Sequence, residues 1–362
     1  MAEFRVPAKQ AYDFCETAFR KMGFSSGESE KIAKILNLAD VYGIESHGIQ
    51  RMWRYYTQTM NGSIHRDAVP EIVFETPVSA VIDGHDGMGQ IISHKAIELA
   101  IEKAKKSGMA IVSVRNSNHY GIAGYYTKLA AEQGLIALSM TNTEAMMVQT
   151  YAKKPILGTN PIAMAVPADP HPFWFDAATT VVTRGKLELY AKKEKPLPEG
   201  WAVDENGLPC TDSRRVLDNI IAKRGGGILP LGGSEEETGS HKGYGFGMMC
   251  EIFTAILSGG QTSNHHVRAE KKGAGTCHAF IVIDPAAFGD PAEIKASMSR
   301  LMQELRDSAK ADGKDCIYVH GDKEAAAEAE SQKTGILMKD KTLDELKKIA
   351  AGLGFEAKFD IL

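Results

Sequence analysis

The sequence predicts an α/β fold combined with helical segments at both ends of the chain. From about residue 72, short apolar runs rich in β-branched residues alternate with amphipathic helical patterns. Before that point, and again near the C-terminus, helical patterns dominate. The chain of 362 residues is long enough for about two domains. We therefore expect a discontinuous, mainly helical domain at 1–72 plus 292–362 and an α/β domain at 73–291.

The first 62 residues contain three helical patterns. The first covers 7–22, where a proline suits the opening turn and Gly23 ends the apolar periodicity. Ser25 and Glu28 have the spacing of a capping box, which predicts the start of a second helix. A third helix is expected over 49–60, because an Asn-Gly pair follows it.

The α/β part contains strand and helix patterns in alternation. Strands are expected where short apolar runs stand between turn residues, and helices where the apolar period is close to 3.6. Residues 192–213 are polar and 225–233 are rich in glycine, so both are expected to be loops. The expected strands are 79–84, 109–114, 135–140, 161–167, 173–176 and 278–284, and the expected helices are 93–106, the segment between His119 and Gly134, and 244–257.

Composition and charge narrow the function classes. Hydrophobic residues at 43% and charged residues at 24% are ordinary values for a globular protein. The net charge of -4 argues against nucleic acid or an anionic membrane as a partner. The N-terminal residues form no apolar signal segment, and no run of about 18 apolar residues occurs. We therefore expect a cytoplasmic protein that does not enter a membrane.

The cysteines do not predict a disulfide scaffold or a metal site. Their number is odd, and no CxxC or CxxH pair occurs. His265-His266 and Cys277-His278 lack further ligands at metal-like spacing. We expect no metal and interpret the cysteines as free, mostly buried thiols: Cys15, Cys210, Cys250, Cys277 and Cys316.

Three familiar nucleotide and hydrolase motifs are absent from the sequence. No G-x-G-x-x-G follows an early strand, and no G-x-x-x-x-G-K-[ST] occurs. G-x-S-x-G is missing as well. The chain therefore has neither the Rossmann fingerprint, nor a P-loop, nor the nucleophile elbow of the α/β-hydrolases.

The segment ESHGIQR contains the first group of candidate catalytic residues, Ser46, His47 and Arg51. If the segment is helical, the four-residue spacing brings the imidazole and the guanidinium onto one face. Histidine exchanges protons near neutral pH, and arginine binds a carboxylate through two hydrogen bonds. The alternative is structural: His47 caps or packs, and Arg51 forms a surface ion pair.

His119 and Asp176 each follow an apolar strand, where ligands gather in α/β layers. Asp176 could orient a histidine, bind a ribose hydroxyl, or simply cap the next turn. The alternative for His119 is a structural role. The stretch HKGYGFG combines Lys242 with small residues ahead of an apolar helix, and its cation and backbone N–H groups could hold phosphate. The alternative there is a tight turn against the core.

Several segments together resemble the malate/L-lactate dehydrogenase family, which is unrelated to the Rossmann-type dehydrogenases. The resemblance extends from about residue 7 to about residue 330, and it rests on several motifs in the same order. In chain order they are ESHGIQRM, RNSNHYGIAGYY, LGTNPIAMAVP, FDAATTVVTRGKLELYAKKEKPLPEGWAVDENGLPCTD, LPLGG and SHKGYGFGMMCEIFTAILSGG.

This resemblance implies an oxidoreductase that uses NAD or NADP and interconverts a small 2-hydroxy acid with its 2-oxo acid. It implies a nicotinamide-binding fold without the G-x-G-x-x-G loop, in which 73–291 binds the cofactor, and a homodimer. Malate and oxaloacetate are the first choice of substrate pair. Lactate, sulfolactate, ureidoglycolate, diketogulonate and cyclic imino acids remain open, and so does the choice between NAD and NADP.

Two alternatives belong to other classes. A hydrolase or lyase could use the same side chains without a nucleotide and would keep its activity after exhaustive dialysis. A catalytically inactive binding protein would bind nicotinamide without turnover. The presence of His47, Arg51 and His119 argues against this second alternative.

The resemblance also assigns roles to individual residues. His47 matches the acid/base histidine of the Ser-His-Gly motif, and Arg51 matches the carboxylate-binding arginine. His119 matches a second active-site histidine, so the identity of the proton carrier stays open. The catalytic set expected is Ser46, His47, Arg51, His119 and Asp176.

Cofactor contacts are implied in several segments. Gly321-Asp322-Lys323 departs from the family pattern, in which Glu and Arg are common at the last two positions. The expected cofactor-binding residues are His119, Tyr120, Thr143, Asp176, Ala177, Ala178, His241, Lys242, Gly243, Gly321, Asp322 and Lys323.

Overall fold

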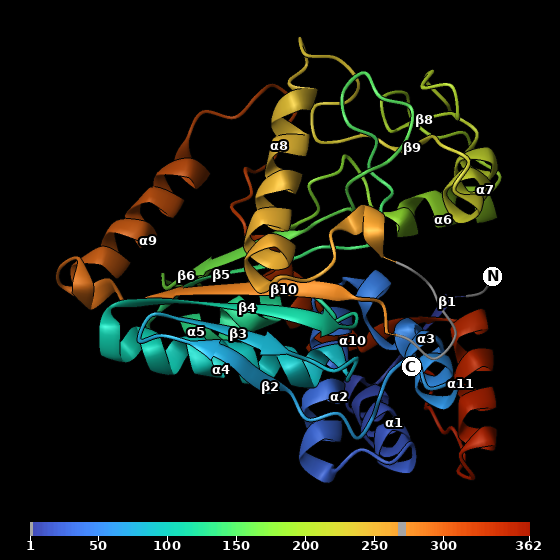
Figure 1. Ribbon diagram of the computed structural model, residues 1–362, viewed down its shortest axis with the longest axis horizontal. Coiled ribbons are helices and arrows are strands. Elements are labelled where there is room, and N and C mark those ends of the chain that lie inside the picture. Colours follow the sequence, from blue (N-terminus) through green and yellow to red (C-terminus); the bar gives the residue numbers. More distant parts are fainter. Residues whose placement is uncertain (1–2, 267–272) are drawn as a thin grey trace.

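A computed structural model describes residues 3–266 and 273–362, and its centre is a seven-stranded mixed sheet (Figure 1). The strand order is β2-β3-β4-β10-β5-β6-β7, in which β3 and β4 are parallel and all other neighbours antiparallel. The late strand β10 thus lies in the middle. The strands are β2 (Glu71–Glu75), β3 (Ser79–Asp83), β4 (Met109–Ser117), β5 (Ile136–Thr141), β6 (Ile162–Val166), β7 (Phe173–Ala177) and β10 (Thr276–Ile283).

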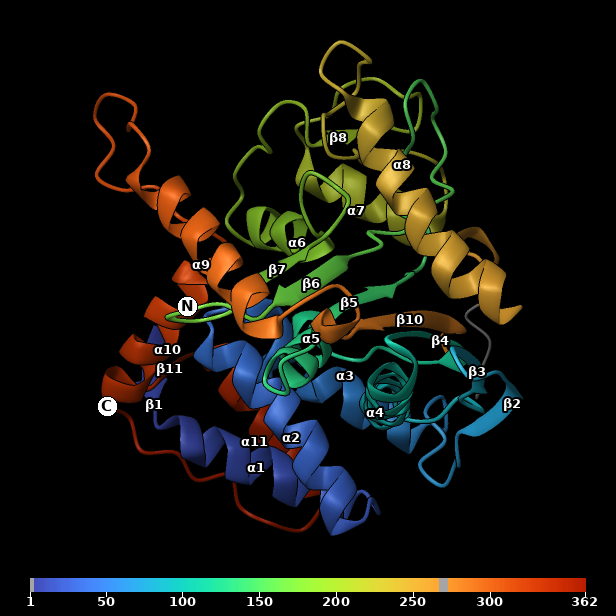
Figure 2. The same ribbon diagram turned by 90° about the vertical axis from the view of Figure 1, so that its left-hand side faces the viewer.

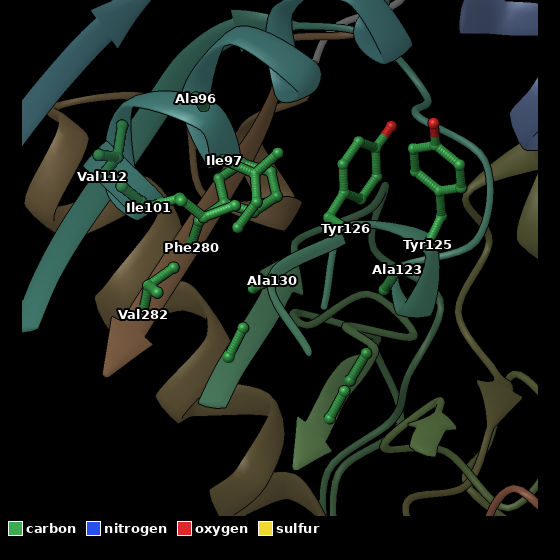
Figure 3. Packing of buried hydrophobic residues seen from close by; sticks show 14 of the residues in the cluster. Ala96, Ile97, Ile101, Val112, Ala123, Tyr125, Tyr126, Ala130, Phe280 and Val282 are labelled. Atoms are coloured by element: carbon green, nitrogen blue, oxygen red, sulfur yellow. The ribbon is translucent and has the colours of Figure 1, made fainter. Parts of the chain in front are cut away.

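One face of the sheet is covered by α4 (Gly89–Ser107) and α5 (Gly124–Ala131), which lie below it in Figure 1. Ile97 and Ile101 of α4 belong to the same buried cluster as Val112 of β4 and Phe280 of β10, as Figure 3 shows. These side chains have relative exposures of 6% or less. This cluster is the main core of the α/β part.

The opposite face is covered by α8 (Ser240–Glu251) and the π-helical turn η3 (Ile252–Ile256) that continues it. Cys250 of α8 packs with Met140 of β5 and Ala279 of β10. Ser113 Oγ of β4 donates to the carbonyl of Phe253 over 2.9 Å. The sheet is therefore a layer between helices, as the alternation of strand and helix patterns predicts.

Helices from both ends of the chain share a second hydrophobic cluster. It contains residues of α1 and α2, and also Ile336 and Ile349 from near the C-terminus. The capping box is confirmed, since Glu28 N donates to Ser25 Oγ and Ser25 N donates to the Glu28 carboxylate over 2.9 Å. The elements are α1 (Ala8–Lys21), α2 (Ser26–Val41), α3 (Met52–Met60), α10 (Asp322–Thr334), α11 (Asp340–Gly352) and the strand pair β1 (Glu3–Val6) with β11 (Ile336–Lys339).

Helix α9 (Pro291–Asp307) packs away from this cluster. Its Met302 is buried against Ala168 and Val319. In Figure 2 it projects beside β6 and β7, and both chain ends lie on the same side of the molecule. The ends are joined directly, because Leu362 N donates to the Arg5 carbonyl over 3.0 Å.

A small third unit was missed in the sequence. Leu187, Val216 and Ile228 form a separate buried cluster in a region that had been expected to be largely loop. Its two strands carry no sequence signal, because two residues are too short to show a period. They are α6 (Arg184–Lys192), β8 (Ala202–Val203), α7 (Ser213–Ala222) and β9 (Gly227–Ile228).

The predicted third helix starts later than expected. Asp40 Oδ2 accepts the N–H of Ile49 over 2.7 Å, and a Cβ at Gly48 would come within 1.8 Å of Asp40 Oδ1. The buried carboxyl of Asp40 therefore stands where a regular first turn would run. Two 3₁₀ turns precede α3 instead: η1 (Glu45–His47) and η2 (Ile49–Arg51).

Two other findings concern the cysteines and the helices. All five cysteines are free, and all but Cys316 are buried, which confirms their assignment as thiols. In the part of the chain that the structure describes, no helix combines the length and apolar composition needed to cross a bilayer.

Candidate active site

The segment 45–51 is held between α2 and β11. Asp40 of α2 binds it through Ile49 N, and the Glu45 carboxylate pairs with Lys339 Nζ of β11 over 2.5 Å. Burial raises the pKa of Asp40 to about 8, so its carboxyl is mostly protonated at neutral pH. These contacts fix the segment from both sides, and its backbone conformation is set by the fold rather than by helix propensity.

His47 and Arg51 lie at the ends of the two 3₁₀ turns, and not on one helix face as predicted. The Ser46 hydroxyl and His47 Nδ1 are 2.9 Å apart. Arg51 Nε donates to the backbone carbonyl of Ser46. Within residues 3–266 and 273–362, the two terminal nitrogens of Arg51 have no hydrogen-bond partner. They remain available to a carboxylate.

His119 follows the end of β4 by two residues. The Tyr55 hydroxyl of α3 lies 2.6 Å from His119 Nδ1, and the N–H of Gly121 lies 3.3 Å from the same atom. An N–H can only donate, so Nδ1 must be an acceptor. The Tyr55 hydroxyl then donates as well, and the ring proton of His119 stays on Nε2. Contacts across the chain therefore determine this tautomer.

The two imidazoles face each other. The ring centroids of His47 and His119 are 5.4 Å apart, with an angle of 24° between the planes. Burial, together with the charges of Arg51 and Arg54, lowers the pKa of His47 to about 3. Burial and the Arg54 charge lower the pKa of His119 well below 6.5. Both rings are therefore neutral at pH 7.

Both histidines keep part of their surface accessible to solvent, and neither Nε2 has a hydrogen-bond partner among the described residues. The fold thus brings together three groups: His119 with a defined tautomer, His47 beside the Ser46 hydroxyl, and the guanidinium of Arg51. The group can bind a carboxylate, polarise an adjacent oxygen and move a proton.

Asp176, at the end of β7, acts as a cap for α5. Its Oδ2 accepts the N–H of Gly124 over 2.8 Å, and burial raises its pKa to about 7. Gly124 is required here, because a Cβ would come within 2.1 Å of the Trp174 ring. Since Tyr55 and Gly121 occupy His119 Nδ1, the tautomer of His119 does not depend on Asp176.

Backbone contacts bring the Thr143 segment and the end of β7 together. Thr143 Oγ1 accepts the N–H of Thr159 over 2.9 Å, and the carbonyl of Thr159 accepts the N–H of Thr179 over 2.9 Å. Ala177 and Ala178 directly precede Thr179. Tyr120 differs from these residues, because its side chain is 2% exposed and stacks on His278. Only its backbone is left for a ligand.

His241, Lys242 and Gly243 lie inside the first turn of α8 and not ahead of it, as the sequence had suggested. The two polar side chains are exposed. A Cβ at Gly243 would come within 2.1 Å of the Leu231 carbonyl, so glycine is needed for α8 to pack there. Leu231 N donates to Thr179 O over 3.0 Å, which connects this turn to the end of β7.

The segment 321–323 is occupied by its own contacts. The Asp322 carboxylate binds Arg306 at 2.7 Å and His171 at 2.9 Å, and it accepts the N–H of Val319 at 2.8 Å. Burial opposes ionisation, but the contacts from Arg306, Val319 and His171 together outweigh it and lower the pKa of Asp322 to about 2. Lys323 Nζ lies 4.9 Å from the Tyr318 ring centroid. Gly321, with φ of 106°, begins α10 against Pro172 and His171.

Comparisons with known proteins agree with this geometry. A family model described as malate/L-lactate dehydrogenase matches residues 6–347. The malate dehydrogenase of Pyrococcus abyssi is 42% identical over 350 residues, which cover 97% of this chain and 95% of that protein. The L-sulfolactate dehydrogenase of Methanocaldococcus jannaschii is 37% identical, with 92% of this chain and 93% of that protein covered.

The solved structure of malate dehydrogenase from Entamoeba histolytica matches with a TM-score of 0.94 and 35% identity, over 98% of this chain and 99% of that one. The chain belongs to the malate/L-lactate dehydrogenase family. The resemblance found in the sequence motifs is thereby confirmed, and so are the fold class and the assignment as a 2-hydroxyacid dehydrogenase.

Three residues in this part of the molecule are not among the predicted site residues: Tyr55, Gly185 and Glu251. Tyr55 lies in the candidate site only because α3 packs beside the end of β4. Gly185 of α6 adjoins Ser46, with 3.8 Å between the position of its Cβ and the serine Cβ. Glu251 of α8 is buried and accepts hydrogen bonds from Asn142 and Asn160 over 3.1 and 2.9 Å. An acidic residue in an apolar helical pattern is a sequence signal that points to Glu251. Tyr55 and Gly185 have no such signal in the sequence.

Proposed function

We propose that this dehydrogenase interconverts malate and oxaloacetate by NAD(P)-dependent hydride transfer. The observation that carries the proposal is the pair of stacked imidazoles, His47 and His119, beside the open fork of Arg51. Relatives at 41–42% identity are named malate dehydrogenase, which supports the choice of substrate. Sulfolactate is the second candidate, since relatives at 37% and 32% identity are named for it. Lactate and ureidoglycolate are the weaker alternatives.

The residues of the α/β domain at 73–291 fit a nucleotide. The first turn of α8 has no side-chain cap, and it carries exposed His241 and Lys242. Ser240 N and Lys242 N already donate to the carbonyls of Glu235 and Gly239, so the exposed Lys242 cation is the main group in this turn that suits anionic phosphates. We propose that Thr143, Asp176 to Ala178 and His241 to Gly243 hold the cofactor. Bound nicotinamide would accept or supply the hydride at C2 of the substrate.

The side chains of the site would divide the remaining work. Arg51 binds the C1 carboxylate of the substrate through its terminal nitrogens. His119 donates a hydrogen bond from Nε2 to the C2 oxygen, because its Nδ1 is occupied by two donors. A neutral imidazole held in this state cannot also accept a proton at Nε2. We therefore assign proton transfer to His47, whose Nδ1 lies beside the Ser46 hydroxyl.

The cellular setting and assembly are also proposals. We propose a cytoplasmic location, which the five free cysteines support because thiols stay reduced in that compartment. A homodimer is supported by an apolar face on α8 and η3, where Phe246, Met249, Ile252 and Ile256 are 43–60% exposed. A contiguous face of this kind on a soluble protein marks a contact surface.

The test is an absorbance assay at 340 nm with oxaloacetate, pyruvate, sulfopyruvate and 2-oxoglutarate, each with NADH and NADPH. Fast oxidation with oxaloacetate is expected and would identify the cofactor. A lack of activity with all four 2-oxo acids would contradict the proposal. Activity without added nucleotide after dialysis would favour a hydrolase or lyase.

The Arg51→Leu variant tests the carboxylate clamp. We expect KM to rise for every 2-oxo acid. The ratio of kcat/KM values should correspond to a loss of about 2–5 kcal/mol of transition-state stabilisation, because a charge pair with the substrate is lost. The matched control is Arg20→Leu, which removes an exposed arginine from the pair with Glu16 on α1. An unchanged KM in Arg51→Leu would exclude the clamp.

A further inference from the structure

Glu251, the last residue of α8, is a buried acid at which several segments of the chain meet. Its side chain is 6% exposed. One carboxylate oxygen accepts from Asn160 Nδ2 over 2.9 Å, and the other accepts from Asn142 Nδ2 over 3.1 Å. The hydroxyl of Ser263 donates to the first of these oxygens as well. A single carboxylate therefore joins α8 to the segment that follows β5 and to the segment that precedes β6.

Backbone N–H groups fix the orientation of both amides. Asn160 Oδ1 accepts the N–H of Thr143 over 3.1 Å. Asn142 Oδ1 accepts the N–H of Cys277 over 2.8 Å. Because an N–H can only donate, each amide oxygen must face its backbone partner, and each NH2 group must face Glu251. Donors thus meet both oxygens of this acid. A carboxylate satisfies the arrangement, whereas the amide of a glutamine would place one NH2 group against another.

Asn160 carries this constraint to a segment that we propose to hold the cofactor. It is fully buried, and its Nδ2 also donates to the carbonyl of Gly247 over 3.1 Å, so α8 holds the amide at two points. On the other side, Oδ1 holds the N–H of Thr143. Thr143 Oγ1 accepts the N–H of Thr159, whose carbonyl accepts the N–H of Thr179. The orientation of one amide therefore bears on where Thr143 and the end of β7 lie.

We propose that Glu251 is a positioning residue for the cofactor site, whose carboxylate keeps the Asn160 amide in the orientation that holds Thr143. This inference rests on the proposed function, in which Thr143 contacts the nucleotide. Glu251→Gln keeps the size of the side chain and replaces one acceptor with an NH2 group. We expect that group on the Asn160 side, because the Ser263 hydroxyl there can accept as well as donate. The Asn160 amide then meets a second donor and must turn away from Thr143.

The first experiment measures by calorimetry how tightly Glu251→Gln and the parent protein bind NADH and NADPH. We expect Kd for the preferred nucleotide to rise about tenfold, because a buried donor near Thr143 loses its acceptor. KM for oxaloacetate at saturating nucleotide should change less than about twofold. The matched control is Thr254→Val, which removes a fully buried hydroxyl that donates to the Cys250 carbonyl over 2.6 Å. An unchanged Kd in Glu251→Gln, or an equal rise in the control, would overturn the proposal.

The Asn160→Gly variant tests whether Glu251 acts through this amide. Glycine suits the backbone at position 160, where φ is 33°. If the carboxylate acts through Asn160, adding Glu251→Gln to Asn160→Gly should leave Kd within about twofold of the value for Asn160→Gly alone. Losses that multiply in the double variant would show a separate route and would contradict the proposal.

Amide hydrogen exchange gives a readout that needs neither nucleotide nor turnover. The N–H of Thr143 should exchange slowly in the parent protein, because it donates to Asn160 Oδ1. It should exchange about tenfold faster in Glu251→Gln and at the parent rate in Thr254→Val. Equal rates in all three proteins would mean that Glu251 does not position Thr143. If the parent binds nucleotide but reduces no 2-oxo acid, the proposed function fails, whereas the role of Glu251 stands. A parent that binds neither nucleotide would overturn both.

Discussion

At the scale of single residues, the chemistry of the candidate site depends on the hydrogen bonds made by the ring nitrogens of His47 and His119. His119 Nδ1 accepts from both Tyr55 and Gly121, so its reactive nitrogen can only donate. His47 has one nitrogen beside a hydroxyl that can either donate or accept, which leaves its protonation free to change. Two histidines in similar surroundings are thereby suited to different tasks.

The Tyr55→Phe substitution tests the tautomer of His119. Loss of the hydroxyl leaves only the longer 3.3 Å contact from Gly121, so the Nδ1–H tautomer becomes accessible. We expect kcat to fall by about ten- to a hundredfold with little change in KM. The ¹⁵N shifts of the His119 ring in the parent protein should report a protonated Nε2. A parent spectrum with the proton on Nδ1 would refute the assignment.

The pH dependence of malate oxidation tests the role of His47. Its pKa of about 3 in the free protein is lowered by burial and by Arg51 and Arg54. Substrate carboxylates offset those two charges and raise this pKa, and the base must be unprotonated to work. The acid limb of kcat, which reports the complex, should therefore lie at higher pH than that of kcat/KM. A kcat limb at or below the pH of the kcat/KM limb would contradict this ordering, and a kcat/KM limb near pH 6.5 would contradict the lowered pKa of His47.

At the scale of elements, the 3₁₀ segment that carries Ser46, His47 and Arg51 is shaped by a buried acid. Asp40 binds Ile49 N and lies against Gly48, which replaces the expected helical turn with two tighter ones. Residues 45–51 are therefore positioned by α2 and β11, and not by α3, with which they are continuous in sequence.

The pKa of Asp40 makes stability depend on pH. Folding raises this pKa from 3.8 to about 8, so the native state holds a proton that the unfolded chain releases. The contribution to the free energy of unfolding is present below about pH 4 and is lost as the pH rises toward 8. Asp40→Asn keeps the acceptor and removes the titration. Its Tm, relative to the parent, should rise between pH 5 and pH 8, and parallel Tm curves would contradict this.

At the scale of the whole molecule, two clusters meet at the site. One joins the helices of both chain ends, and the other joins the sheet to α4 and α5. His47 and Arg51 come from the first part, and His119 from the second. The site therefore exists only when both parts are packed together.

Assembly is tested on the exposed apolar face of α8 and η3. Replacing both Ile252 and Ile256 with Asp places two charges where the proposed dimer contact would be dry. We expect light scattering to give the dimer mass for the parent and the monomer mass for the double variant. Leu301→Asp, on the equally exposed α9, is the control and should remain dimeric. A monomeric parent would refute the dimer.

Much of the fold was predictable because the signals are local. The Ser25–Glu28 cap, six of the seven strands of the sheet and the main helices follow from patterns within a few residues, whereas the exposed edge strand β2 was not expected. The two-residue strands β8 and β9 could not be predicted, because they are too short to show a sequence period. They are stabilised by packing against the cluster that contains Leu187 and Val216. The start of α3 was also missed, since Asp40 acts on it from another helix.

The sequence alone determined which chemical groups this protein has and where along the chain they stand: Ser46, His47, Arg51 and His119, in motifs that also identify the family. Tertiary structure alone decided their states. The hydroxyl of Tyr55 reaches His119 across 64 positions of the chain, and Asp40 distorts the turn that carries His47. The physical reason is that tautomers, pKa values and local backbone conformation depend on burial and on neighbours in space, which local sequence patterns do not contain.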